Sequence, residues 1–115
     1  MDLLSRTFFY ARKIVSFYAS LPNSTVAQIL GKQLLRSGTS AGANYREANQ
    51  GGSRAELLAN MGDCLKELSE ADYWLELLHA EDLGDQRGRG DLLQETRELI
   101  AIFIAIIKNT KRNTP

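Results

Sequence analysis

The sequence predicts an all-α fold, a left-handed up-down-up-down bundle of four helices that assembles as a ring. Apolar residues recur three or four positions apart through most of the 115 residues, which is the period of a helix face. Three turn-forming stretches, LPNS, QGGS and LGDQRGRGD, divide this pattern into four segments. A chain of this length forms one domain around a single core. We therefore predict one domain, 1–115, with helices over approximately 3–20, 24–50, 54–82 and 91–111.

The first two segments carry apolar stripes at helical spacing. Between them, Pro22 is a helix breaker, and Asn23 or Ser24 can cap the second helix by accepting one of its unpaired N–H groups. The first segment has two adjacent stripes, one of Leu4, Phe8, Ala11, Val15 and Tyr18, and one of Tyr10, Ile14, Phe17 and Leu21. The stripe of the second segment comprises Val26, Ile29, Leu30, Gln33, Leu34, Ser37, Ala41, Asn44, Tyr45 and Ala48.

Residues 36–48, RSGTSAGANYREA, have a composition that suits a loop, a phosphate-binding loop or a closely packed helix. A phosphate-binding loop of the GxxxxGK[ST] type follows a strand, whereas no strand-like run precedes Gly38 and no lysine follows Gly42. The helical stripe continues through the stretch without a break, so we predict a helix whose glycines admit a neighbouring backbone. A bent or broken helix is the alternative. The packing signature comprises Arg36, Ser37, Gly38, Ser40, Ala41, Gly42, Asn44 and Glu47.

The third and fourth segments have N-terminal capping signals. Ser53 and Glu56 form an S-x-x-E capping box, and Asp91 can cap the fourth helix. Large apolar residues outside the core stripe of the third segment predict a contact between subunits, formed by Tyr73, Trp74 and Leu77. The predicted core stripe of the third segment comprises Leu57, Met61, Cys64, Leu68, Ala71, Leu75 and Leu78. The faces of the fourth segment carry Leu92, Thr96, Leu99, Phe103 and Ile106 beside Leu93, Ile100 and Ile107.

Residues that would support catalysis or metal binding are sparse. Glu76 and His79 have the E-x-x-H spacing of di-iron bundles, but such sites need the motif twice and the chain has one histidine. A metal site shared between subunits is the alternative. Cys64 falls on a core stripe and is interpreted as a packing residue. We predict no catalytic residue, no metal ligand, no cofactor and no small-molecule substrate, and we do not expect an enzyme.

The cellular compartment is predicted from cysteine usage and hydropathy. A single cysteine excludes an internal disulfide framework and favours a reducing compartment. The N-terminal MDLLSRTFFYARK does not resemble a signal peptide. The apolar run 99–107 is well short of the roughly 20 residues that cross a bilayer. We expect a cytoplasmic protein with no membrane partner.

Charge is distributed unevenly along a chain whose formal net charge is zero. Residues 1–46 hold six basic and one acidic side chain, residues 47–82 hold nine acidic and two basic ones, and residues 83–115 hold six basic and four acidic ones. One interpretation is that charged helix faces are simply solvated. The other is a bipolar molecule, in which the acidic third helix of one subunit meets a basic first or second helix of the next. Such a contact joins unlike surfaces and closes into a ring when the rotation allows.

Five motifs stand out in the sequence: Arg36-Ser37, Ser40-Ala41-Gly42-Ala43-Asn44-Tyr45 with Glu47, Ser53 with Glu56-Leu57, Leu65-Lys66-Glu67-Leu68 and Tyr73-Trp74-Leu75. With them the chain resembles the four-helix-bundle proteins encoded by intervening sequences of bacterial 23S ribosomal RNA genes. The resemblance covers nearly the whole chain and implies a small bacterial bundle without catalytic activity, commonly a homopentamer. It also implies kinship with the basic, nucleic-acid-binding accessory variability proteins of retroelements.

Two hypotheses for function follow. The first is an oligomeric bundle that binds RNA, or a protein complex containing nucleic acid, through its bases. The second is a scaffold for protein–protein interaction with no nucleic-acid role, which the neutral total favours. The candidate nucleic-acid-binding residues are Arg12, Lys13, Lys32, Arg36, Arg87, Arg89, Lys108, Lys111 and Arg112.

Asn44 is the polar residue of the second stripe whose environment is hardest to explain. If its amide is buried, it needs hydrogen-bond partners, and Arg36 or Glu47 from the same or a neighbouring helix can supply them. We therefore predict a polar constellation of Arg36, Asn44 and Glu47. The alternative is that Asn44 lies at the edge of the bundle in water.

Overall fold

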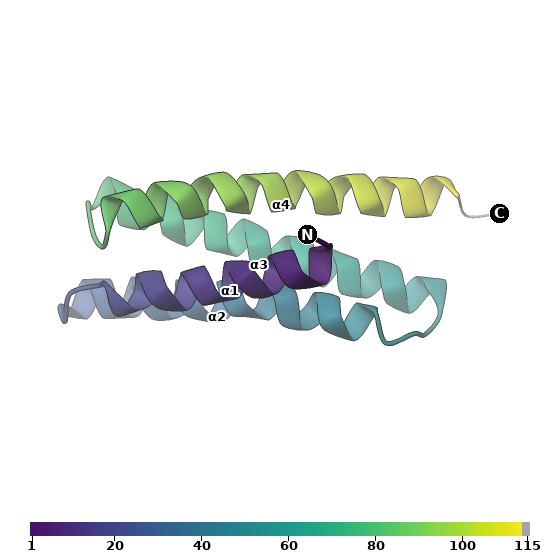
Figure 1. Ribbon diagram of the computed structural model, residues 1–115, viewed down its shortest axis with the longest axis horizontal. Coiled ribbons are helices and arrows are strands. Elements are labelled where there is room, and N and C mark those ends of the chain that lie inside the picture. Colours follow the sequence, from purple (N-terminus) through teal and green to yellow (C-terminus); the bar gives the residue numbers. More distant parts are fainter. Residues whose placement is uncertain (114–115) are drawn as a thin grey trace.

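The computed structural model describes residues 1–113, which form four α-helices and no strand. They are α1 (Leu3–Ala19), α2 (Thr25–Ala48), α3 (Arg54–Ala80) and α4 (Gln86–Arg112). Each helix packs against its neighbour in sequence, and α4 also contacts α1 (Figure 1). The molecule measures 52 × 24 × 20 Å. The prediction of an all-α fold with four helices is confirmed, while bundle handedness and assembly remain predictions.

An N-terminal capping side chain starts every one of these helices. The Ser24 hydroxyl accepts a hydrogen bond from the N–H of Ala27, and the Ser53 hydroxyl accepts one from the N–H of Glu56, as predicted. The prediction for α4 was wrong, because the helix begins at Gln86 and is capped by Asp85 instead of Asp91. Asp85 Oδ2 accepts from the N–H of Gly88 at 2.7 Å, so residues interpreted as a glycine-rich loop form the first turn of the helix.

The core lies along the predicted stripes of α3 and α4. Six of the seven residues of the α3 stripe are buried, and Leu57 is half-buried. Cys64 is fully buried among them, and burial raises the pKa of its thiol to about 12, which is typical of an unreactive packing cysteine. Between α1 and α4, the Tyr10 and Thr96 hydroxyls share a buried hydrogen bond of 2.6 Å.

The orientation of α1 determines which of its two apolar stripes enters the core. Its buried residues are Thr7 and three members of the second stripe, Tyr10, Ile14 and Phe17. In the first stripe Leu4, Phe8 and Val15 are exposed. Both stripes have helical spacing, so periodicity alone could not distinguish the core side from the solvent side.

The glycines of α2 explain how closely α1 approaches. Residues 36–48 belong to an unbroken helix, as predicted. A β-carbon on Gly38 would lie 2.7 Å from Cγ1 of Ile14, and one on Gly42 would lie 3.2 Å from the backbone oxygen of Thr7. Side chains at these positions would push α1 away, so glycine is required for the observed packing.

Replacing two helical glycines by alanine separates packing from helix propensity. Gly38→Ala should lower the free energy of unfolding by about 1–3 kcal/mol, because the new methyl group overpacks against the fully buried Ile14. Gly62→Ala should instead raise it by up to about 1 kcal/mol, since nothing lies within 4 Å of the added carbon in α3. Urea unfolding measures both. A Gly38→Ala variant as stable as the wild type would contradict the close approach of α1.

Candidate nucleic-acid interface

Arginines from neighbouring helices neutralise most of the acidic residues in the middle of α3. Arg36 of α2 forms ion pairs with Glu67 at 3.1 Å and with Glu70 at 2.5 Å. A hydrogen bond to Glu70 and the charge of Glu67 raise the pKa of Arg36 above its ordinary value. The acidic surplus of residues 47–82 is therefore partly compensated within the same chain.

Two further arginines repeat this arrangement. Arg97 of α4 pairs with Asp72 at 3.3 Å and with Glu76 at 2.6 Å on α3. Arg6 of α1 pairs with two glutamates of α4, Glu95 at 2.7 Å and Glu98 at 3.2 Å. In each case two carboxylates three or four residues apart on one helix hold one arginine of the next helix. This spacing is visible in the sequence, but the arginine that each pair holds cannot be identified without the fold.

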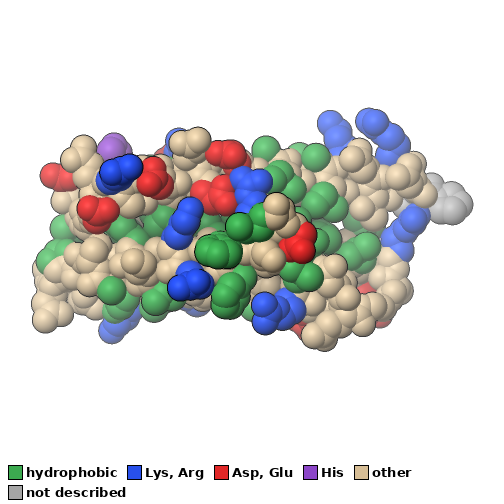
Figure 2. Space-filling model, in the orientation of Figure 1, with side chains coloured by type: hydrophobic (Ala, Val, Ile, Leu, Met, Phe, Trp, Pro, Cys, Tyr) green, Lys and Arg blue, Asp and Glu red, His purple; other side chains and the backbone are tan. Residues whose placement is uncertain are grey.

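Four cations of α1 and α2 differ from these arginines. Arg12, Lys13, Lys32 and Arg46 are exposed, and none of them forms an ion pair within residues 1–113. Figure 2 looks onto α1 and shows hydrophobic side chains over its middle, with Lys and Arg side chains on several sides. The exposed side of α1 and the adjoining part of α2 therefore carry cations that form no ion pair. Lys13 lies toward α4, where it lines one depression with Glu95 and another with Asp85 and Asp91.

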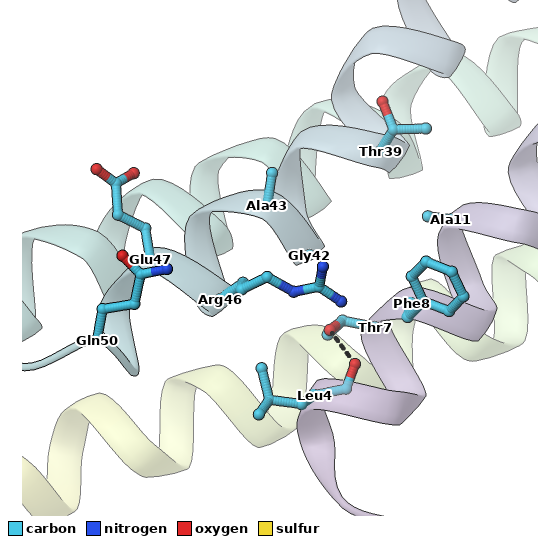
Figure 3. A pocket seen from close by; sticks show the side chains of 10 residues that line it. All are labelled: Leu4, Thr7, Phe8, Ala11, Thr39, Gly42, Ala43, Arg46, Glu47 and Gln50. Carbon is cyan, nitrogen blue, oxygen red and sulfur yellow. Dashed lines mark hydrogen bonds between the residues drawn. The ribbon is translucent and has the colours of Figure 1, made fainter.

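A groove lies between α1 and α2 beside this surface. Gly42 allows the helices to approach, and Arg46 reaches from α2 toward Thr7 and Phe8 of α1, whereas Glu47 points away from them (Figure 3). The guanidinium carbon of Arg46 lies 5.8 Å from the centre of the Phe8 ring. The groove has a volume of about 510 Å³ and combines an apolar wall with a cation.

The remaining predicted bases do not belong to this surface. Lys108, Lys111 and Arg112 lie in the last turns of α4, and Arg87 lies in its first turn, at opposite ends of a helix of 27 residues. Arg36 is exposed but paired with α3. The predicted set therefore separates into an α1–α2 group, an isolated Arg87 and a cluster at the C-terminal end of α4.

Arg89 is a correction to the predicted set, because its side chain is 1% exposed and does not reach the surface. Its Nη1 donates to the carbonyl of Leu83 at 2.8 Å, and its Nη2 bonds to Asp82 at 3.2 Å. Its Nε is buried and has no partner within the described chain. Arg89 therefore holds the α3–α4 connection against the core.

The predicted constellation of Arg36, Asn44 and Glu47 does not form within the chain. Arg36 reaches α3 instead, and Glu47 is exposed at the rim of the groove. Asn44 is half-buried, and its amide bonds to neither of the other two. This outcome fits the alternative in which Asn44 lies at the edge of the bundle.

Apolar side chains also gather on the outer side of α2 and α3. Tyr73 is 59% exposed and lies edge-to-face against the half-buried Trp74, with ring centres 5.0 Å apart. Both line a shallow depression with Gln33 of α2. On α2, Val26 and Ile29 are exposed, although the sequence pattern placed them in the buried stripe. The predicted apolar stripe of α2 was therefore wider than the face of the helix that is buried in the core.

The described residues form neither a candidate metal site nor a candidate membrane span. Within residues 1–113, no group of three or more His, Cys, Asp or Glu side chains converges to hold a metal ion. Glu76 of the E-x-x-H spacing is held by Arg97. None of the helices in this part of the chain combines the length and hydropathy that a bilayer crossing requires.

Alanine substitutions at two arginines of α4 test whether Arg89 is structural. Arg89→Ala should lower the free energy of unfolding by about 2–4 kcal/mol, because it opens a cavity and leaves the Leu83 carbonyl without its donor. Arg87→Ala, at an exposed position two residues earlier, should stay within about 0.5 kcal/mol of the wild type. Thermal or urea unfolding compares the two. Equal stabilities of the two variants would contradict the structural role of Arg89.

Comparison with known proteins identifies the family. No protein with a curated description matches the chain. A crystal structure of a protein of unknown function from the S23 ribosomal protein family of Bacteroides thetaiotaomicron is similar, with 37% sequence identity and a TM-score of 0.83. The similarity covers 93% of this chain and 99% of that one. The family model of the 23S rRNA-intervening sequence protein matches residues 1–105, so the chain belongs to the 23S rRNA-intervening sequence protein family.

Proposed function

We propose that the protein is a non-enzymatic, oligomeric helical bundle that binds RNA through the α1–α2 surface. The observation that carries the proposal is the set of unpaired cations Arg12, Lys13, Lys32 and Arg46. Surface cations that form no ion pair are available to phosphates, and their binding releases the counterions of the nucleic acid. In residues 1–46 the only acid is Asp2, whose carboxylate caps α1.

The neutral net charge does not argue against this function once the ion pairs are considered. Carboxylates of α3 are compensated by Arg36 and Arg97, so their field at the opposite side of the bundle is reduced. The positive surface of α1 and α2 then remains attractive to phosphates. A scaffold without a nucleic-acid role is the competing proposal, and it offers no explanation for the unpaired cations.

We also propose that the protein self-associates through the apolar side of α2 and α3. The patch comprises Val26, Ile29, Tyr73, Trp74 and Leu77, and aromatic residues of this kind carry much of the binding energy of interfaces. A ring of five subunits is what the family resemblance supports. Because Glu67, Glu70, Asp72 and Glu76 pair within the subunit, charge complementarity contributes less to this contact than the uneven charge distribution along the sequence implied.

Neutralising the unpaired cations should reduce both RNA affinity and its salt dependence. A variant with Arg12, Lys13, Lys32 and Arg46 replaced by Gln should bind a single-stranded RNA more weakly. Its slope of log affinity against log salt should be shallower by up to about 3, at about 0.7 per lost phosphate contact. Fluorescence anisotropy over a salt series measures the slope. Lys66→Gln, which removes one cation from α3, is the control and should change little. Wild-type affinity that is absent, or independent of salt, would contradict the function.

Trp74→Ala should weaken self-association more than a charge reversal, because buried aromatic area carries more energy than one exposed charge. Lys66→Glu, at an exposed position on the same helix, supplies the comparison. Since Trp74 also packs against the core, Tyr73→Ser provides a second test at a mainly exposed position. Light scattering measures the mass of each variant. A wild-type protein that is monomeric at tens of micromolar would refute the ring.

A further inference from the structure

We infer that Phe8 and Phe9 of α1, with Arg46 and Arg12 beside them, form a platform on which unpaired bases of a single nucleic-acid strand stack. The inference rests on the proposed function and adds a preference for one form of nucleic acid. Unlike the phosphate contacts, it concerns the bases, and it assigns a role to two aromatic residues that the core does not use.

The two phenylalanines are unusually accessible for residues of their type. Phe8 is 51% exposed and Phe9 is 44% exposed, whereas the other two phenylalanines, Phe17 and Phe103, are buried. Because Tyr10, Ile14 and Phe17 hold α1 in the core, rotation of the helix cannot bury Phe8 and Phe9. Their rings are therefore presented to solvent by a helix whose orientation is set elsewhere.

Each exposed ring has its own arginine. The guanidinium carbon of Arg46 lies 5.8 Å from the centre of the Phe8 ring, and that of Arg12 lies 5.7 Å from the centre of the Phe9 ring. Neither arginine pairs with a carboxylate within residues 1–113. A base that stacks on either ring would therefore have a cation nearby for its phosphate, which is the combination found in single-strand-binding proteins.

The two rings line a second groove, which adjoins the one between α1 and α2 and shares Leu4, Phe8, Arg46 and Gln50 with it. This groove contains Phe8, Phe9 and Arg46 together with the polar side chains Asn49 and Gln50 at the C-terminal end of α2. The amide nitrogen of Asn49 donates to the Tyr45 carbonyl, which leaves its amide oxygen to accept a hydrogen bond. Aromatic rings flanked by side-chain amides are complementary to a base, whose faces stack on rings and whose edges form hydrogen bonds. Duplex nucleic acid keeps its base faces stacked inside the helix, so the platform favours an unpaired strand.

A second copy of the chain is the competing occupant of this groove. A second copy would have to bring carboxylates to Arg12 and Arg46. The acidic residues in the middle of α3, Glu67, Glu70, Asp72 and Glu76, already pair with arginines of their own subunit. Charge complementarity therefore favours a polyanion over the middle of α3 of a second subunit at the groove.

The test compares leucine substitutions on a single strand and on a duplex. The probe is a short labelled RNA of mixed sequence, alone or annealed to its complement, and binding is followed by fluorescence anisotropy at one moderate salt concentration. The variants are Phe8→Leu and Phe9→Leu, alone and combined. Leucine keeps the apolar character and helix propensity but removes the ring. Val15→Ala, at an exposed apolar position on the same helix, is the matched control, and Phe8→Trp restores a stacking surface.

The expected result is a loss of single-strand affinity of about fivefold or more in the double leucine variant, the lower end of what one stacked base contributes. Duplex affinity should stay within about twofold, Val15→Ala should bind like the wild type, and Phe8→Trp should bind at least as well. A DNA strand of the same sequence should lose the same factor, since base faces are shared. A loss confined to RNA would place the contact on the 2′-hydroxyl and overturn the inference.

Failure of the inference and failure of the proposed function are distinguishable. If the wild type binds the strand with the expected salt dependence and the leucine variants bind equally well, only the stacking inference is overturned. If single-strand and duplex affinities fall together, or the mass by light scattering falls while binding persists, the rings serve another role and the inference is again overturned. A wild type that binds no nucleic acid at all overturns both.

Discussion

The packing of α1 against the glycine side of α2 determines which surface the protein presents. Gly38 and Gly42 have no side chain, so Ile14 and the backbone at Thr7 approach α2 directly. Once α1 is seated in this way, Tyr10, Ile14 and Phe17 enter the core, and the other apolar stripe of the same helix faces outward. The exposed position of Phe8 and Phe9 is a consequence of that orientation. Two residues without side chains on α2 thus position the aromatic surface on α1.

The ion pairs across the helices have a complementary effect on charge. Arg6, Arg36 and Arg97 each hold two carboxylates of a neighbouring helix, and all three lie at the surface where such pairs contribute about 1 kcal/mol or less to stability. Their larger effect is on the electrostatic surface, because they neutralise the acidic helices and leave the cations of α1 and α2 uncompensated. A chain of zero formal charge therefore has a polarised surface.

Local signals in the sequence were sufficient for the number and order of the helices and for most of the core. Serine caps and the stripes of α3 and α4 follow from periodicity and capping chemistry, which depend on residues a few positions apart. The start of α4 was predicted five residues late, since Gly88 and Gly90 resemble a loop unless Asp85 is known to cap the first turn. The glycines favour a loop at this point, whereas the hydrogen bond from Arg89 to the Leu83 carbonyl favours the helix.

The candidate site was less predictable, because it depends on rotations and on partners from other helices. Both apolar stripes of α1 have the spacing of a buried helix face, and only the packing of α1 against α2 shows which stripe is buried. Arg36 and Arg89 have the same residue type as Arg12 and Arg46, yet one is paired and one is buried. Composition identifies cations, but availability to a ligand is a property of the fold.

The surface that we propose to bind nucleic acid comprises α1 and the C-terminal part of α2. Photo-crosslinking of a single-stranded RNA containing 5-iodouridine, followed by mass spectrometry of the tryptic peptides, tests this proposal directly, because this base crosslinks efficiently to aromatic rings that stack on it. We expect crosslinks to Phe8 or Phe9, with none to Tyr73 or Trp74 on α3. Crosslinks confined to α3, or to the last turns of α4, would contradict it.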